Sequence, residues 1–188
     1  MDVKVIEAKL LRNPKYSSAW VENAAKILAN TNVFVEETLA KCSSEQLEII
    51  NAALEYNTKN ENKVSILDIA DTSLNATQMR LIFAGQQNHV SIATLKQLVN
   101  KDIPYVISNY AVQAAIEGHD MSKYVNGLYD NDQVYEIYAG LHNGIDVSCY
   151  DNTNISANIM GLMRHASELG FISEYDETTK SISIKVNE

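Results

Sequence analysis

Apolar residues recur at three-and-four spacing along most of the chain, which is the pattern of amphipathic α-helices. The clearest instance predicts a helix over residues 130–144. Its apolar stripe consists of Val134, Ile137, Tyr138 and Leu141. Asp130 and Gln133 are spaced as a capping box at the start, and Gly144 is placed to end the helix in the left-handed conformation. The pattern therefore predicts both the helix and its two boundaries.

The same arrangement recurs along the chain, so further long helices are expected. They are predicted at residues 18–30, 43–57, 75–89, 102–118 and 156–170. Pro104 is tolerated inside the first turn of the helix at 102–118. Between the long helices lie short segments such as 65–70 and 122–125, which open with a Val-Ser or Met-Ser step. Serine is a good helix cap, so these segments are predicted to be short helical turns.

A seven-residue phrase repeats within this pattern. Gly118 to Tyr124 reads GHDMSKY, Gly144 to Tyr150 reads GIDVSCY 26 residues later, and a decayed copy begins at Gly170. A fixed period of this length is typical of stacked supersecondary units that bury their apolar faces against one another. We therefore expect a mainly α fold, with stacked helical repeats forming a small α-solenoid and a β-hairpin at the C-terminus. Such a fold favours surface recognition over catalysis.

The two ends depart from the repeat. Residues 1–42 are expected to form an N-terminal helical cap, 43–170 the helical repeat array and 171–188 the C-terminal β-hairpin. The hairpin is indicated by the alternation of Ile182, Ile184 and Val186 with polar residues, as in a half-buried strand. The start of the chain, Val3 to Ile6, fits either a strand or the first turn of a helix that runs to Arg12.

The chain offers little that resembles catalytic chemistry. The two cysteines, Cys42 and Cys149, form no CxxC pair, and no HExxH, GxSxG, Walker or GxGxxG motif is present. Asp120 and Asp146 occupy the same place in successive repeats, so we interpret them as turn residues that bind nearby backbone amides. The expectation is a non-enzymatic protein with no cofactor and no metal.

No apolar run approaches the roughly 20 residues that a membrane span requires, and the start of the chain does not resemble a signal peptide. A cytoplasmic protein without a membrane partner is therefore expected.

Charge and tyrosine are concentrated in one part of the chain. Residues 102–151 carry eight acidic side chains against Lys123 alone, and they hold seven of the ten tyrosines. Acidic groups repel phosphates, so direct binding of nucleic acid is disfavoured and a basic protein is the natural complement. Tyrosine is enriched at interface hot spots, which agrees with a protein-binding role.

The tyrosines divide into two groups. Tyr124 and Tyr150 are in register in the repeat and are expected to pack between units, and Tyr138 lies on the apolar stripe and is expected in the core. Five residues are the candidate partner-binding site: Tyr129, Asp130, Asp132, Tyr135 and Glu136. An acidic face that serves only solubility is the competing interpretation.

The Gly-x-Asp-Val-Ser-x-Tyr phrase, preceded by the helix from Gln133 to Leu141, resembles short helical repeats of the type QMxEIRxGLxxGLDVSxYxxP in proteins of bacterial mobile elements. The resemblance extends over residues 44–170 and is strongest over 118–160. It departs from that pattern in lacking a proline after Tyr124 or Tyr150, and Gln86 and Ser167 replace the usual leucine. The resemblance implies a helical scaffold in a mobile-element or phage context and no enzymatic activity.

Three functional hypotheses follow. The first is an anti-CRISPR-like inhibitor that binds a basic nucleic-acid-binding bacterial protein, such as a Cas9-type effector with its guide RNA. The second is a winged-helix-like, DNA-binding transcriptional regulator built from residues 156–186, where only Arg164, Lys180 and Lys185 are basic. The third is a structural assembly scaffold.

Overall fold

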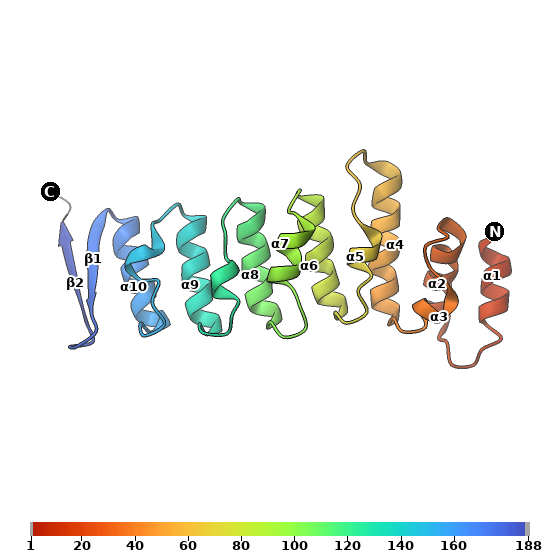
Figure 1. The fold of residues 1–188 in the computed structure, drawn as a ribbon, viewed down its shortest axis with the longest axis horizontal. Helices are drawn as coiled ribbons and strands as arrows, with labels where there is room; N and C mark the ends of the chain where they lie inside the picture. Colours follow the sequence, from red (N-terminus) through yellow and green to blue (C-terminus); the bar gives the residue numbers. More distant parts are fainter. Residues whose placement is uncertain (1, 187–188) are drawn as a thin grey trace. The chain divides into compact units, whose positions relative to one another are not determined.

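The computed structural model describes residues 2–186, and over these residues the chain is mainly helical with a two-stranded hairpin at its C-terminal end (Figure 1). The chain divides into two compact units, Met1–Lys96 and Gln97–Glu188. Helix α7 (Ile92–Leu98) begins in the first unit and ends in the second. The prediction of a mainly α protein ending in a β-hairpin is confirmed.

The first unit is entirely helical in its described part. Its elements are α1 (Val3–Leu10), α2 (Ser18–Asn30), α3 (Glu36–Leu39), α4 (Ser44–Lys59), α5 (Ile66–Ile69) and α6 (Ala76–Gln87). The longer helices pack consecutively, α1 against α2, α2 against α4 and α4 against α6. The open alternative for the start of the chain is thus decided in favour of a helix, α1.

The second unit alternates long helices with single 3₁₀ turns. Its elements are α8 (Tyr105–Ile116), the 3₁₀ turn η1 (Ser122–Tyr124), α9 (Asn131–His142), the 3₁₀ turn η2 (Val147–Cys149), α10 (Ala157–Glu168), β1 (Phe171–Asp176) and β2 (Ser181–Val186). Helix α9 contacts α8 on one side and α10 on the other.

The start of α8 differs from the prediction. The helix begins at Tyr105 rather than at Asp102, and Pro104 is its N-cap, with an extended backbone (φ −54°, ψ 137°), rather than a residue of its first turn. The physical reason is that a proline disfavours the helical conformation in the residue before it, so the helix cannot extend back through Ile103.

Capping boxes fix the starts of three long helices. Ser43 with Gln46, Asn75 with Gln78, and Asp130 with Gln133 each form the reciprocal pair of hydrogen bonds. The capping box predicted at Asp130 and Gln133 is thus confirmed. The three glutamines are also buried.

The side-chain amides of Gln46 and Gln133 also bind backbone carbonyls outside their own helices, which the sequence does not reveal. Gln46 Nε2 donates to the carbonyl oxygen of Leu74 at 2.7 Å, and Gln133 Nε2 donates to that of Ile155 at 2.7 Å. Each accepting carbonyl lies one residue before the N-cap of the next long helix. The buried amide therefore fixes the start of one long helix relative to the start of the next.

The ends of the long helices confirm the predicted left-handed stop. Gly144 has φ +70° after α9, and the amide of Ile145 donates to the carbonyl oxygen of Gly140 at 2.8 Å, which is the Schellman pattern. His89 holds the same place after α6 with φ +65°, and the amide of Val90 donates to the carbonyl oxygen of Gly85 at 3.0 Å. The helix ends alike whether glycine or histidine occupies this position.

The short turns use two kinds of cap. Ser65 and Ser91 cap α5 and α7 through their hydroxyl groups, as predicted for serine. In the second unit Asp146 is the cap of η2, where its Oδ1 accepts from the amide of Ser148 at 2.9 Å. The corresponding residue before η1 is Met121, so the predicted serine cap is absent from this turn. Asp120 Oδ1 instead accepts from the amide of Ser122 at 2.9 Å. The prediction that these aspartates bind backbone amides is confirmed, and those bonds lower the pKa of both carboxyls.

Tyr124 and Tyr150 belong to the core of the second unit, as their register predicts, with exposed fractions of 3% and 0%. Tyr150 lies directly over Gly140, where a Cβ atom would approach its hydroxyl oxygen to 1.9 Å. A glycine is thus required at this point of α9 because the tyrosine occupies the space of a side chain.

The hairpin has the predicted strands, joined by residues 177–180. β1 and β2 are antiparallel, with Ser173 opposite Ile184 and Tyr175 opposite Ile182. The expectation of a half-buried β2 is only partly met, because Ile182 is half-buried whereas Ile184 and Val186 are 55% and 72% exposed. Helix α10 packs mainly against β1, so the outer strand lacks a covering layer.

Among the described residues no helix is both long enough and apolar enough to cross a membrane.

Candidate protein-binding surface

The first turns of α9 carry four of the five candidate partner-binding residues. Asp130 is the N-cap, and its Oδ1 accepts from the amide of Gln133 at 2.8 Å while the residue stays exposed. Asp132 and Tyr135 are both exposed, Tyr135 by 44%. Neither of these two side chains forms a hydrogen bond with the described residues of the unit (97–186), so both are available to another molecule.

Tyr129 is turned toward the interior of the unit. Its hydroxyl donates to Asp151 Oδ1 at 2.6 Å, and the hydroxyl of Tyr124 donates to Asp151 Oδ2 at 2.9 Å. Lys123 forms an ion pair with the same carboxylate, whose side chain is only 7% exposed. Asp151 therefore holds the segment before α9 against the segment after η2.

The environment of Asp151 has opposing effects on its protonation. Burial by itself raises the pKa of the carboxyl, but the hydrogen bonds from Lys123, Tyr129 and Tyr124 outweigh that effect and leave the pKa below its usual value. Burial and the bond to Asp151 raise the pKa of Tyr129 to about 12. At neutral pH the cluster therefore contains an ionised carboxylate and two neutral phenols.

Glu136 is likewise occupied within the unit. Its Oε2 accepts from Arg164 Nε at 2.8 Å, and the two side chains are only 16% and 18% exposed. Arg164 also pairs with Glu168, four residues along α10. A Cβ atom at Gly161 would lie 3.2 Å from the Glu136 carboxyl carbon, so α10 closes over this pair. Glu136 thus joins α9 to α10.

A second aromatic group lies where α8 meets α9, and we call Tyr110, Tyr135 and Tyr138 the tyrosine ridge. The ring centroids of Tyr110 and Tyr138 are 5.4 Å apart and stacked, and those of Tyr110 and Tyr135 are 5.5 Å apart and tilted. Tyr138 is half-buried, so its predicted place in the core is wrong. The reason is that its side chain lies at the surface between the two helices, beside Tyr110, rather than beneath α9.

Carboxylates lie at both ends of the tyrosine ridge. Glu117 at the C-cap of α8 faces the hydroxyl of Tyr138 at 3.5 Å and Nδ1 of His142 at 3.0 Å. Asp132 lies one turn before Tyr135 on α9. The ridge is therefore a partly exposed aromatic surface, with Tyr135 the most accessible of its rings, and it is bordered by negative charge.

The structure thus narrows the predicted site and extends it. Of the five predicted residues, Asp132 and Tyr135 remain available, whereas Tyr129 and Glu136 have partners inside the unit and Asp130 caps a helix. Sequence reasoning missed Tyr110 and Glu117 as neighbours of this site. The available signal was their position on the preceding long helix, two turns apart, but a single sequence does not give the rotation of one helix against the next.

Residues 2–186 contain no group of three or more histidine, cysteine or acidic side chains placed to hold a metal ion. Cys42 is buried, and burial raises the pKa of its thiol. Cys149 is exposed and lies in η2.

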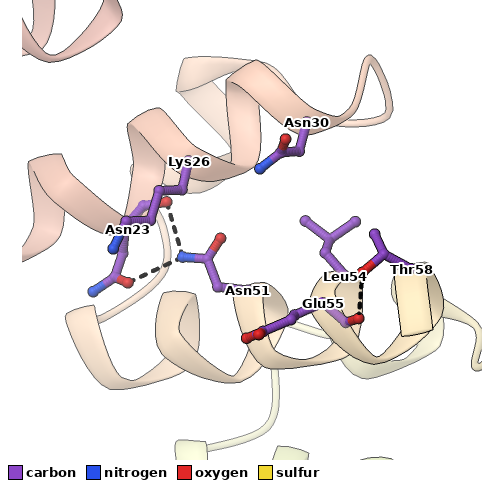
Figure 2. A pocket seen from close by; sticks show the side chains of 7 residues that line it. All are labelled: Asn23, Lys26, Asn30, Asn51, Leu54, Glu55 and Thr58. Carbon is purple, nitrogen blue, oxygen red and sulfur yellow. Dashed lines mark hydrogen bonds between the residues drawn. The ribbon is translucent and has the colours of Figure 1, made fainter. Parts of the chain in front are cut away.

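A polar groove of about 400 Å³ lies between α2 and α4 (Figure 2). It is lined by Asn23, Lys26, Asn30, Asn51, Leu54, Glu55 and Thr58. Figure 2 shows Asn51 directed at Asn23, where its Nδ2 donates to the backbone oxygen at 3.1 Å and to Oδ1 at 3.0 Å. Lys26 and Glu55 each pair along their own helix. The groove's main polar contact therefore joins the two helices.

Comparison with known proteins gives no match: no protein-family model, no curated protein and no solved structure is significantly similar to the chain.

Proposed function

We propose that this protein is a non-enzymatic binding module of a mobile genetic element, which inhibits a basic nucleic-acid-binding bacterial protein. An anti-CRISPR-like inhibitor of a Cas9-type effector is the specific form of the proposal. The partner lies against the tyrosine ridge and the carboxylates that border it.

The observation that carries this proposal is the exposed, unoccupied pair Asp132 and Tyr135 beside Tyr110 and Tyr138. A guanidinium group of a basic partner can stack on an aromatic face and pair with a neighbouring carboxylate at the same time. Tyrosine offers a large rigid surface at a low entropic cost of ordering, because it has only two side-chain torsions. The ridge therefore fits an arginine-rich surface.

Charge supports the same kind of partner. Residues 97–188 carry thirteen acidic and five basic side chains. A field of this sign attracts a basic protein and accelerates its association, whereas it repels the phosphates of DNA or RNA. A protein with these features competes with nucleic acid for a basic channel.

We also propose that the long helices and short turns stack as a small α-solenoid, in which neighbouring repeats share a recognition surface. Consecutive packing of α2, α4 and α6, and separately of α8, α9 and α10, supports this arrangement within each compact unit.

The DNA-binding alternative has a weaker basis. Helix α10 followed by β1 and β2 has the outline of a winged helix. However, Arg164 is held by Glu136 and Glu168, and Lys185 is paired with Glu174 at 2.7 Å. Only Lys180 then remains to meet phosphates in this segment, which is a small footprint for a DNA-binding surface.

The test is direct binding and inhibition with a purified Cas9-type effector carrying its guide RNA. We expect salt-sensitive binding and slower cleavage of target DNA, and we expect Asp132→Lys and Tyr135→Ala each to weaken binding by about tenfold. These two positions are preferable to Asp130 and Glu136, because substitution there also removes a helix cap or an ion pair.

The matched control is Glu48→Lys, which makes the same charge reversal at an exposed helical position of α4 in the first unit. The control should bind as the unmodified protein does. Binding that neither Asp132→Lys nor Tyr135→Ala alters would place the contact elsewhere. If the protein shifted random duplex DNA at low salt but did not bind the effector, the winged-helix alternative would be favoured.

A further inference from the structure

The C-terminal hairpin ends the described part of the second unit with an open strand. Its sheet contains only β1 and β2, and β1 lies between β2 and α10 in Figure 1. Among residues 2–186 no other segment pairs with β2. The outer edge of β2 therefore presents backbone amide and carbonyl groups that are free to pair with a further strand.

The two faces of the hairpin differ in character. One face carries Ser173 and Tyr175 of β1 opposite Ile184 and Ile182 of β2. On this face Ile184 is 55% exposed, and the buried hydroxyl of Ser173 has no hydrogen-bond partner in the described structure. The apolar row of β2 is thus only partly covered, with Ile184 and Val186 exposed.

The other face is polar on β2. It carries Ser181, Ser183 and Lys185, and the Lys185 ammonium is paired with Glu174 of the same hairpin at 2.7 Å. Proteins commonly protect an open edge with charged side chains, proline or a bulge. β2 contains no proline, and its single charged residue, Lys185, is paired with Glu174 on the adjacent strand, so this edge is weakly protected.

We propose that the outer edge of β2 pairs with the same edge of a second copy of this chain, antiparallel and centred on Ser183. In this register Ser183 faces Ser183 of the second copy, and Ile182 faces its Ile184. A two-fold axis relates the copies, so each residue makes the contact that its counterpart makes. The result is a four-stranded antiparallel sheet.

The register is favourable on both faces. On the apolar face the isoleucines of the two β2 strands form one cluster of four, flanked by Tyr175 of each copy, and such cross-strand pairs stabilise a sheet. On the polar face Lys185 lies in the same row as Ser181 and Asp176 of the second copy. The Ser-Ile-Ser-Ile alternation makes the strand complementary to itself, which favours a second copy over an unrelated peptide.

The contact is small, since it rests on one strand from each copy. Interfaces that bury little surface are typical of reversible assemblies. We therefore expect a monomer–dimer equilibrium whose dimer fraction rises with protein concentration.

Analytical ultracentrifugation of the full chain over a concentration series tests the proposal. Ile184→Lys places a charge in the isoleucine cluster twice per dimer and should raise the dimer dissociation constant by about tenfold or more. Leu67→Lys is the control, because Leu67 is 65% exposed on α5 in the first unit. It should leave the dissociation constant unchanged.

Disulfide trapping tests the register itself, in a Cys149→Ser background that removes the exposed native thiol. Opposite residues in an antiparallel pair have Cα atoms about 4.5 or 5.5 Å apart, within the range that a disulfide spans. Ser183→Cys should therefore form a covalent dimer under mild oxidation. Ser181→Cys should not, because the two copies of residue 181 lie about 13 Å apart along the seam.

A monomer at every concentration would overturn the proposal. So would a dimer that Ile184→Lys leaves intact and that Ser183→Cys fails to trap, since that dimer would use another surface. Neither result bears on the tyrosine ridge, because the ridge is tested by its own substitutions at Asp132 and Tyr135.

Discussion

The two compact units solve one packing problem in different ways. After α6 in the first unit, Leu95 of α7 packs against Gly85, ten residues earlier. After α9 in the second unit, Tyr150 packs against Gly140, again ten residues earlier. Tyr124 likewise follows Ala114 by ten residues in the sequence. A glycine near the end of α6 and of α9 thus leaves room for the large residue of the segment that follows.

The change from leucine to tyrosine accompanies a change in charge. Residues 1–96 carry eleven acidic and ten basic side chains, whereas residues 97–188 carry thirteen and five. In the first unit, Lys26 pairs with Glu22 along one helix, and Lys96 of α7 pairs with Asp68 of α5. In the second unit, Glu136 with Arg164 joins successive helices. Some acidic and aromatic residues of the second unit are therefore buried or paired inside it, and others lie on its surface. For this reason composition alone overstates how many of them a partner can contact.

The largest expected effect concerns the buried aromatic residue. Tyr150→Ala should lower the free energy of unfolding by about 3–5 kcal/mol, because it empties the space of a fully buried ring. Leu95→Ala should cost somewhat less, about 2–4 kcal/mol, because it removes fewer buried atoms. Denaturant unfolding measures both.

Two further substitutions test the hydroxyl group of Tyr150 and a tyrosine at the surface, for comparison with the buried ring of Tyr150. The Tyr150 hydroxyl lies 3.4 Å from the Glu136 carbonyl oxygen, which is a long contact, so Tyr150→Phe should cost less than about 1 kcal/mol. Tyr135→Ala, at an exposed position, should cost no more than about 0.5 kcal/mol. If Tyr150→Phe were as harmful as Tyr150→Ala, the hydrogen bond and not the packing would explain the tyrosine.

An intermediate effect is expected at the receiving glycines. In Gly140→Ala the new methyl group would meet the Tyr150 hydroxyl oxygen at 1.9 Å and a Val147 methyl carbon at 2.8 Å, so overpacking should cost about 1–3 kcal/mol. In Gly85→Ala the methyl group would meet the Leu95 side chain, with the nearest carbon at 2.4 Å. A leucine side chain changes rotamer more readily than a buried tyrosine ring moves, so the second substitution should cost less. Equal costs would mean that the two units are packed alike, although leucine fills the space in the first unit and tyrosine in the second.

Local sequence signals were sufficient for most of the secondary structure. The capping residues Asn75 and Asp130 and the stop at Gly144 each act within a few residues of themselves, so a single sequence reveals them. The start of α8 lies three residues after the predicted Asp102, because Pro104 disfavours the helical conformation in the residue before it.

Contacts between helices could not be obtained in the same way. The repeat predicted that Tyr124 and Tyr150 are buried, because register is a property of the sequence. It did not reveal that Tyr129 turns to Asp151 or that Glu136 pairs with Arg164, since both depend on the rotation of neighbouring segments. Those rotations decide which of the predicted site residues are free.

The last prediction tests whether the acidic residues of the second unit are structural. The folded state lowers the pKa of Asp151, so the unfolded chain binds this proton more readily, and the stability due to Asp151 is present at neutral pH and is lost as the pH falls through the lowered value. Asp151→Asn should cost about 1–2 kcal/mol at neutral pH, because it replaces a charged acceptor of three hydrogen bonds. The variant should also lose less stability than the unmodified protein between neutral pH and about pH 3. Asp132→Asn, at an exposed position, should change neither quantity, and urea unfolding at several pH values measures both. If the two variants behaved alike, Asp151 would be one more surface carboxylate, and the distinction between acids that build the second unit and acids that face a partner would fail.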